Sequence, residues 1–276
     1  MSTETHTQSQ STSGIACSDL QGEAPNQKWI IEGWLPEGKV TTLCGDGAPG
    51  KSLLAVMLGE AISQGKPFVG LPVTTPMPVL GLFTEDSEDE LHRRLYSAQY
   101  FSDNADSATD EQLYDYRLWS RNYGGNTLVE IGENGECRHG PFFGQLIAEL
   151  NNMGPAPKLL ILDTLLDLLV APQDARKAIS KFIKVVLGDI CRDHNCTVLL
   201  VGDLSSFELS TSITWTRDAQ NCFILRHMKP FRDYRVLICA KSGDDQPGTQ
   251  INLKLEDNTF KVVNPAEIYD EEEAKK

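Results

Sequence analysis

The sequence predicts an α/β fold with a mostly parallel central sheet, and three observations support this. Residues 158–163 (KLLILD) and 196–202 (CTVLLVG) are nearly continuous apolar runs, typical of strands that are buried on both faces. Segments with an apolar helical face alternate with the strand-like segments, as in a parallel sheet with crossover helices. After Trp215, strand-like segments follow one another closely, which predicts an antiparallel extension at the C-terminal end of the core.

The remaining elements follow from local patterns. Residues 38–44 (GKVTTLC) are rich in β-branched side chains and predict a strand, and residues 51–64 predict a helix with its leucines on one face. A second helix is expected at 87–100, where Ser87 followed by Glu90 forms the pattern of a capping box. We also expect helices at 142–153 and 173–194, and strands at 78–84, 221–226, 234–240, 249–255 and 259–263.

The chain of 276 residues is long enough for one domain with a sizeable core. Residues 1–25 are rich in Ser, Thr and Gln and predict a disordered tail, and residues 265–276 predict an acidic C-terminal tail. Between them, residues 26–264 contain no clear linker or repeat. We therefore expect a single folded domain over 26–264.

Composition excludes several classes of function. The chain has 25 Lys and Arg residues and 39 Asp and Glu residues. The resulting net charge of −14 argues against binding nucleic acid or lipid through bulk charge. The chain contains no run of 18 uncharged apolar residues, and its amino terminus does not have the pattern of a secretory signal. The seven cysteines include no Cys-x-x-Cys pair. We expect a cytoplasmic protein with reduced thiols and no membrane partner.

Residues 45–52 (GDGAPGKS) match the complete G-x-x-x-x-G-K-S/T pattern of a phosphate-binding loop. Glycines allow the backbone N–H groups to face a phosphate, and the following helix adds its positive N-terminal end. We expect Lys51 to reach the β- and γ-phosphates of ATP and the Ser52 hydroxyl to ligate Mg²⁺. A chance Gly-rich turn is the alternative, but a strand before the motif and a helix after it are both expected. The predicted nucleotide-binding residues are Gly45, Asp46, Gly47, Ala48, Pro49, Gly50, Lys51, Ser52 and Leu53.

Two carboxylates follow expected strands and are candidates for catalysis. Asp163 ends the run KLLILD, where P-loop enzymes place the acid of the Mg²⁺ site; a turn or N-cap Asp is the alternative. Glu85 follows the strand after the phosphate-loop helix and can orient the attacking water, because the carboxyl ends of parallel strands meet at one edge. The neighbouring Asp86 should point away from it. The alternative is that both acids belong to the acidic loop that starts the next helix.

This layout resembles the RecA-type P-loop ATPases, and within them the RepA-like hexameric replicative helicases of plasmids and phages. The resemblance covers about residues 28–263 and rests on four segments: WIIEGWLPEGKVTTLCGDGAPGKS up to the phosphate loop, FTED, LHRRL and LDTL. It implies a RecA-like P-loop NTPase core that hydrolyses Mg-ATP, with ATP and Mg²⁺ as cofactors. It also implies a homo-oligomeric ring, such as a hexamer, that acts on single-stranded DNA.

A late segment adds a candidate that acts between subunits. The sequence AKSG at 240–243, followed by PGT, resembles the Lys-x-Arg-x-x-x-x-Gly-Thr hairpin of the related DnaB-type helicases. This resemblance implies that Lys241 is a catalytic cation that reaches into the ATP site of the neighbouring subunit. The alternative is a hairpin Lys that balances Asp244 and Asp245. The second basic residue of that hairpin is Gly243 here.

The family's DNA-binding loops have few counterparts here. Arg176 and Lys177 follow the Asp163 strand and are candidate nucleic-acid contacts, although both also fit a solvated helix face. The second loop has no Lys or Arg over 203–216, and its strand ends in Gly202 and Asp203 where the family has a polar sensor. Arg217 is a third candidate nucleic-acid contact and a candidate substitute for a missing arginine, with a surface residue as the alternative.

Two functions from different classes fit the sequence. The first is an oligomeric ATP-driven motor on single-stranded DNA in plasmid or phage replication or recombination, such as a helicase. The second is a regulatory or assembly ATPase that does not translocate on DNA, which the missing basic residues favour. A metabolite kinase is a weaker third interpretation, because no second basic cluster for a phosphorylated acceptor is evident.

Overall fold

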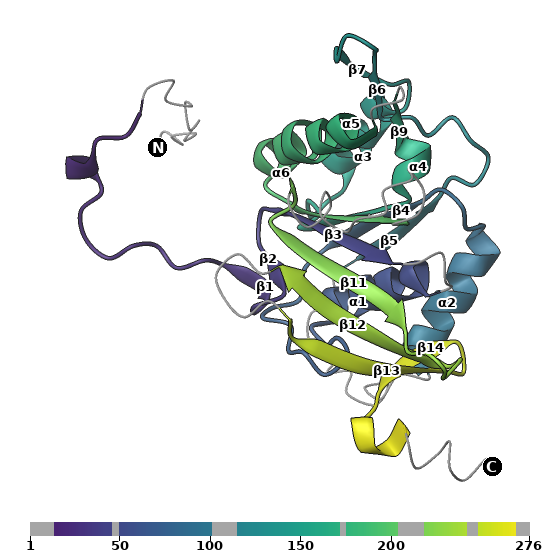
Figure 1. The fold of residues 1–276 in the computed structure, drawn as a ribbon. Helices are drawn as coiled ribbons and strands as arrows, with labels where there is room; N and C mark the ends of the chain where they lie inside the picture. Colours follow the sequence, from purple (N-terminus) through teal and green to yellow (C-terminus); the bar gives the residue numbers. More distant parts are fainter. Residues whose placement is uncertain are drawn as a thin grey trace.

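The computed structural model describes residues 14–45, 50–100, 115–171, 175–203, 218–241 and 248–268. Its centre is a nine-stranded sheet with the order β14-β13-β12-β11-β3-β10-β8-β4-β5, and helices cover both faces (Figure 1). Six adjacent strands form a parallel block. They are β3 (Val40–Gly45), β4 (Val79–Phe83), β5 (Tyr116–Ser120), β8 (Leu159–Asp163), β10 (Thr197–Asp203) and β11 (Asn221–His227). The fold is the mostly parallel α/β fold that the sequence predicts.

The C-terminal strands extend this sheet in antiparallel order. They are β12 (Tyr234–Lys241), β13 (Gln250–Glu256) and β14 (Thr259–Val262). The prediction was wrong for the first strand after Trp215, because β11 pairs parallel with β3, with Asn221 opposite Thr41 and Leu225 opposite Gly45. This strand lies between β3 and β12 and is buried from residue 221 to residue 225, which is the setting of a core strand.

Helices form a layer on each face of the sheet. One layer contains α1 (Lys51–Gln64) and α2 (Glu88–Tyr100). The other contains α3 (Phe143–Asn152), α5 (Ala175–Lys181) and α6 (Gly188–His194). A π-helical segment, η3 (Phe182–Leu187), joins α5 to α6, so the helix expected over 173–194 is observed from residue 175 but is not α-helical throughout.

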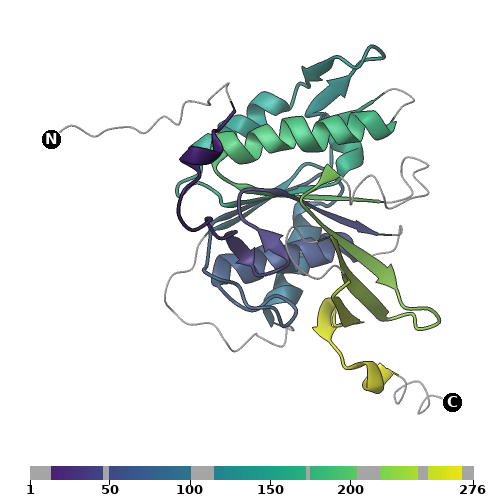
Figure 2. The same ribbon diagram turned by 60° about the vertical axis from the view of Figure 1, so that its left-hand side comes forward.

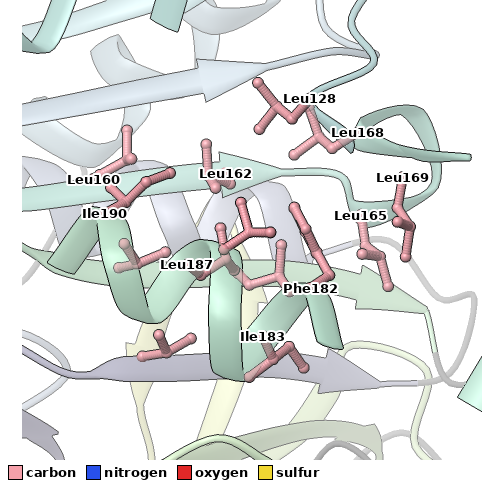
Figure 3. Packing of buried hydrophobic residues seen from close by; sticks show 14 of the residues in the cluster. Leu128, Leu160, Leu162, Leu165, Leu168, Leu169, Phe182, Ile183, Leu187 and Ile190 are labelled. Carbon is pink, nitrogen blue, oxygen red and sulfur yellow. The ribbon is translucent and has the colours of Figure 1, made fainter. Parts of the chain in front are cut away.

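Side chains of β8 alternate between the two layers, which explains the continuous apolar run at 158–163. Leu159 and Ile161 pack in the cluster around α1, whereas Leu160 and Leu162 pack in the cluster around the opposite helices. All four are 0% exposed. Figure 3 shows the second cluster, in which β8 faces Phe182, Ile183, Leu187 and Ile190.

The capping box expected at the start of α2 is only half formed. The backbone N–H of Glu90 donates a hydrogen bond to Ser87 Oγ over 3.2 Å. The Glu90 carboxylate does not return to Ser87 and instead accepts hydrogen bonds from Arg93 and Arg94. Two arginines outcompete one backbone N–H here because hydrogen bonds between opposite charges are the stronger ones.

Several short elements were not predicted, because two to five residues carry too little periodicity. Those outside the main sheet are η1 (Cys17–Asp19), β1 (Trp29–Ile31), β2 (Leu35–Pro36), β6 (Val129–Ile131), β7 (Cys137–His139), α4 (Leu165–Leu168) and β9 (Leu169–Val170). Strands β7, β6 and β9 form a small sheet. Both views place β6 and β7 beyond the α5 layer (Figures 1 and 2).

The ends of the chain are described only in part. Residues 1–13 and 269–276 lie outside the described residues, and residues 14–26 are exposed. Residues 265–268 form a helical turn, and Ile268 is 1% exposed, so the packed body includes residues that the sequence assigned to the acidic tail. Among the described helices, none combines the length and the apolar character that crossing a membrane requires.

Candidate nucleotide site

The register of the parallel strands collects polar residues at one edge of the sheet. Gly45, at the end of β3, pairs with Asp203 at the end of β10. Asp163, at the end of β8, lies opposite Phe83 of β4, and Glu85 follows two residues later. Four adjacent strands therefore deliver a glycine and three carboxylates to the same edge.

A cavity of about 610 Å³ lies at this edge. Three groups of residues surround it: the start of α1, the ends of β4, β8 and β10, and one side of α2 with the β13–β14 turn. Its lining residues are Gly50, Lys51, Ser52, Leu53, Glu85, Glu90, Arg93, Arg94, Asp163, Thr164, Asp203, Leu255 and Asn258. Of the predicted phosphate loop, Asp46, Gly47, Ala48 and Pro49 lie outside the described residues.

Two motif glycines are required by packing as well as by their position in the loop. A Cβ on Gly45 would overlap with the backbone carbonyl oxygen of Leu225 on β11. Gly50 has φ +137°, and a Cβ there would lie 2.7 Å from Cζ of Phe260 on β14. Side chains at either position would collide with the C-terminal strands, so these strands and the motif fit together only with glycine.

Lys51, the first residue of α1, is paired with a carboxylate whose contact the sequence did not predict. Its Nζ forms an ion pair with Oδ1 of Asp203, and the side chains of Lys51 and Asp203 are 11% and 35% exposed. The sequence does show that Asp203 lies at the end of a predicted strand. The structure places this strand next to the phosphate-loop strand. The partner of Asp203 depends on the register of β3 with β10, which the sequence does not reveal.

Asp163 is a buried carboxylate with an unsatisfied oxygen. Burial raises its pKa to about 7, and a hydrogen bond from the Ser52 side chain acts in the opposite direction. Within the described part of the chain, its Oδ2 has no hydrogen-bond partner. A carboxylate oxygen beside a hydroxyl is the type of donor set that Mg²⁺ prefers, so Asp163 and Ser52 fit this ion.

The backbone around Asp163 is held by Thr84, which follows β4. The N–H of Thr84 donates to the Asp163 carbonyl oxygen over 2.6 Å, and its Oγ1 donates to the same oxygen over 3.2 Å. Thr84 Oγ1 also accepts a hydrogen bond from the N–H of Thr164 over 3.1 Å. These bonds fix the ends of β4 and β8 relative to each other.

Glu85 and Asp86 have different surroundings. Glu85 is exposed and lines the cavity. Partial burial and the charges of Asp167, Asp203 and Asp86 raise its pKa, and Lys51 lowers it. Asp86 forms a 2.8 Å ion pair with Arg94. A carboxylate with a raised pKa beside the phosphate-loop lysine is suited to accept a proton from water.

Arg93 and Arg94 are site residues to which the sequence analysis assigned no role. Both line the cavity, where Arg93 pairs with Glu90 and Arg94 pairs with Glu90 and Asp86. The sequence signal for these arginines is the motif LHRRL, which places Arg93 and Arg94 three and four residues after Glu90 on a helix. Two arginines of this chain, each paired with a carboxylate, therefore lie at the cavity.

Lys241 is not among the residues that line the cavity with Lys51. It pairs with Cys222 at the start of β11, whereas the phosphate loop begins beside Leu225 further along that strand. Its Nζ donates a 2.6 Å hydrogen bond to the Ala219 carbonyl oxygen.

Two of the candidate nucleic-acid contacts, Arg176 and Lys177, are not among the residues that line the cavity. Arg176 and Lys177 are exposed on α5, while Arg217 lies outside the described residues.

Fold and sequence motif together define the class of this protein as a RecA-like α/β domain with a phosphate-loop motif. A KaiC-like protein from Pyrococcus horikoshii aligns with a TM-score of 0.50 and 16% identity, over 85% of this chain and 94% of that chain. The RadB recombinase aligns with a TM-score of 0.51 and 17% identity, over 83% of this chain and 92% of that chain. At these identities the likeness concerns the fold.

The family assignment comes from the sequence. The family model AAA_25, described as AAA domain, matches residues 6–205, and the chain belongs to this family. A comparison with curated proteins finds no match.

Proposed function

We propose that this protein is a Mg-ATP-hydrolysing ATPase of RecA type, with its ATPase unit at residues 26–264. The observation that carries the proposal is that Lys51, Ser52, Glu85 and Asp163 all line one cavity at the carboxyl edge of a parallel sheet. Ligands of such sheets bind in the crevice outside the carboxyl ends of the strands. The phosphate-loop motif at the start of α1 identifies the ligand as a nucleoside polyphosphate.

Each of these residues has a distinct role in the proposed reaction. The Lys51 ammonium would bind the β- and γ-phosphates, while Ser52 and the Oδ2 atom of Asp163 would hold the metal ion. Mg²⁺ supplies positive charge to the phosphate oxygens when bound. Glu85 orients the attacking water and accepts its proton, which its raised pKa favours. Arg94 offers a further cation to the γ-phosphate if it leaves Asp86.

A second hollow extends the site in a direction that suits a nucleoside. It has a volume of about 430 Å³ and shares Arg93 and Asn258 with the phosphate cavity. Its wall includes the half-exposed ring of Tyr96 and the polar side chains of Asp257 and Asn258. An aromatic face with hydrogen-bonding groups beside it is a suitable surface for a base and its ribose.

At a finer level, we propose an oligomeric motor on single-stranded DNA, similar to the RepA-like replicative helicases. The position of Lys241 at the other end of β11 supports assembly, because its ammonium would need the site of a second subunit to contact phosphate. Exposed Arg176 and Lys177 supply candidate DNA contacts, with Arg217 as a third. A solved structure of similar fold is named as a recombinase.

The second candidate is a regulatory or assembly ATPase that does not translocate on DNA. The observation that favours it is the charge of the chain, which is −14 overall and includes no Lys or Arg over residues 203–216. Phosphate contacts normally need cations or backbone N–H groups. A protein partner would explain an ATPase with so few of them.

One pair of measurements tests the proposal. ATP hydrolysis is measured with and without single-stranded DNA, and the molar mass in solution is measured with and without ATP. The motor predicts hydrolysis that DNA stimulates, together with assembly beyond the monomer. Hydrolysis that DNA leaves unchanged favours the regulatory ATPase, and no hydrolysis under any condition contradicts both.

A further inference from the structure

Asp203 occupies a position from which it can oppose the binding of phosphate. Its carboxylate contacts the Nζ of Lys51, the same ammonium that a phosphate-loop lysine presents to a nucleotide. Both residues line the phosphate cavity. A nucleotide therefore has to replace Asp203 at Lys51, or bind beside it.

The carboxylate of Asp203 lines the same cavity as the carboxylates of Glu85 and Asp163. Its charge acts on Glu85, the residue assigned to the attacking water, and raises the pKa of that group. Asp203 is the last residue of β10, the strand next to β3, and it lies opposite Gly45. The metal-site residue Asp163 lies opposite Val201, which is two residues earlier on β10. Three carboxylates thus line the cavity to which the γ-phosphate of a bound triphosphate would add further negative charge.

We propose that Asp203 is a specificity-determining residue that competes with nucleotide phosphate for Lys51 and disfavours a triphosphate more than a diphosphate. This inference rests on the proposed function, since it requires a nucleotide in this cavity. Like charges repel more strongly where water is partly excluded, and the γ-phosphate carries the charge that a diphosphate lacks. The site is consequently tuned to bind ATP more weakly, relative to ADP, than its phosphate-loop motif alone would predict.

The test uses the full-length protein and calorimetric titration with two probes, a non-hydrolysable Mg-ATP analogue and Mg-ADP. Asp203→Asn keeps the size of the side chain and removes its charge. It is expected to tighten binding of the ATP analogue by roughly tenfold, equivalent to about 1.4 kcal/mol, and of ADP by less. Asp203→Glu, which retains the charge, is expected to restore most of the wild-type ratio of the two affinities.

A matched control removes the same charge elsewhere. Asp189 is half-exposed on α6 and pairs with Arg192 over 2.8 Å. Asp189→Asn should leave both affinities unchanged, which separates a local effect from a change in net charge. Thermal unfolding of each variant reports whether the fold is retained. We expect it to be retained in Asp203→Asn, because the Asp203 side chain is 35% exposed.

The outcomes separate this inference from the proposed function. Unchanged affinities in Asp203→Asn, or equal tightening for the two probes, overturn the role of Asp203 as a discriminating residue while nucleotide binding by the wild type still stands. If neither the wild type nor Asp203→Asn binds either probe, the proposed function fails and this inference fails with it. The inference on Asp203 is supported if the ratio of the ATP-analogue dissociation constant to the ADP dissociation constant falls in Asp203→Asn and does not change in Asp189→Asn.

Discussion

Gly45 and Leu225 lie opposite each other on the parallel strands β3 and β11, so close that a Cβ on Gly45 would overlap with the Leu225 carbonyl oxygen. The first glycine of the phosphate-loop motif is therefore needed for the sheet itself. This contact joins the motif to the strand that begins the C-terminal part of the sheet. A side chain at residue 45 would therefore have to displace this strand.

Replacing Gly45 should accordingly destabilise the protein. We expect Gly45→Ala to lower the free energy of unfolding by about 1–3 kcal/mol, the cost of inserting a methyl group into a packed region. Gly144→Ala is the control, because Gly144 lies in α3 and a Cβ there meets no atom within 4 Å. Denaturation in urea measures both variants. A Gly45→Ala protein as stable as Gly144→Ala would show that the contact with Leu225 is relieved at little cost.

Glu85 and Asp86 should differ sharply when each loses its charge. Glu85→Gln retains the shape of the side chain but cannot accept a proton from water, so turnover should fall by roughly 10²–10⁴-fold while nucleotide binding persists. Asp86→Asn breaks the pair with Arg94 and should affect turnover less. Steady-state ATPase rates and nucleotide titrations distinguish the two. An active Glu85→Gln protein beside an inactive Asp86→Asn protein would move the role of general base to Asp86.

Lys241 should act across a subunit boundary. Lys241→Ala is expected to hydrolyse ATP poorly by itself, although its own phosphate loop is intact. Lys51→Ala protein still carries Lys241, so mixing the two inactive variants should restore part of the activity. The ATPase rate of the mixture is compared with the rate of each variant alone. Absence of recovery, or normal hydrolysis by Lys241→Ala alone, argues against the role between subunits.

Glu60 provides a prediction on pH. This residue of α1 is 6% exposed, accepts a 3.1 Å hydrogen bond from Gln99 and has a pKa that burial raises. Because the folded state holds the proton more tightly than the unfolded state, the free energy of unfolding should fall as pH rises from the ordinary Glu pKa through the raised value. Glu60→Gln carries no titrating group there and should escape this loss.

The comparison is made by denaturation of both proteins between pH 4 and pH 8. The stability gained by Glu60→Gln should be smallest at acidic pH, grow as pH rises and then level off. A gain that is equal at all pH values would show that the carboxylate does not titrate with folding.

Much of the fold and part of the candidate site could be predicted from the sequence, because both rest on local patterns. The side chains of residues 159–162 alternate between two cores, which explains why these four residues are all apolar. Lys51 and Ser52 belong to a contiguous motif, and Glu85 and Asp163 follow strands whose ends meet at one edge. The structure brings these four residues to one cavity, while their roles remain predictions.

What the sequence analysis missed depends on which segments become neighbours. Asp203 contacts Lys51 only because β10 inserts beside β3, and β11 is parallel only because it pairs with β3 on the other side. Arg94 was visible as part of a helical motif, yet its pairing with Asp86 is set by the turn between β4 and α2. Such contacts join positions far apart in the sequence, or on both sides of a turn, and no local period encodes them.

The central claim is that Lys51 holds nucleotide phosphate in the cavity at the edge of the sheet. Calorimetric titration with Mg-ATP tests it most directly, using wild type, Lys51→Ala and Lys158→Ala as a lysine control at the opposite end of β8. We expect wild type and Lys158→Ala to bind alike, and Lys51→Ala to lose about 1.5–3 kcal/mol, the contribution of hydrogen bonds to a charged group. Binding of equal strength in all three proteins would contradict the account.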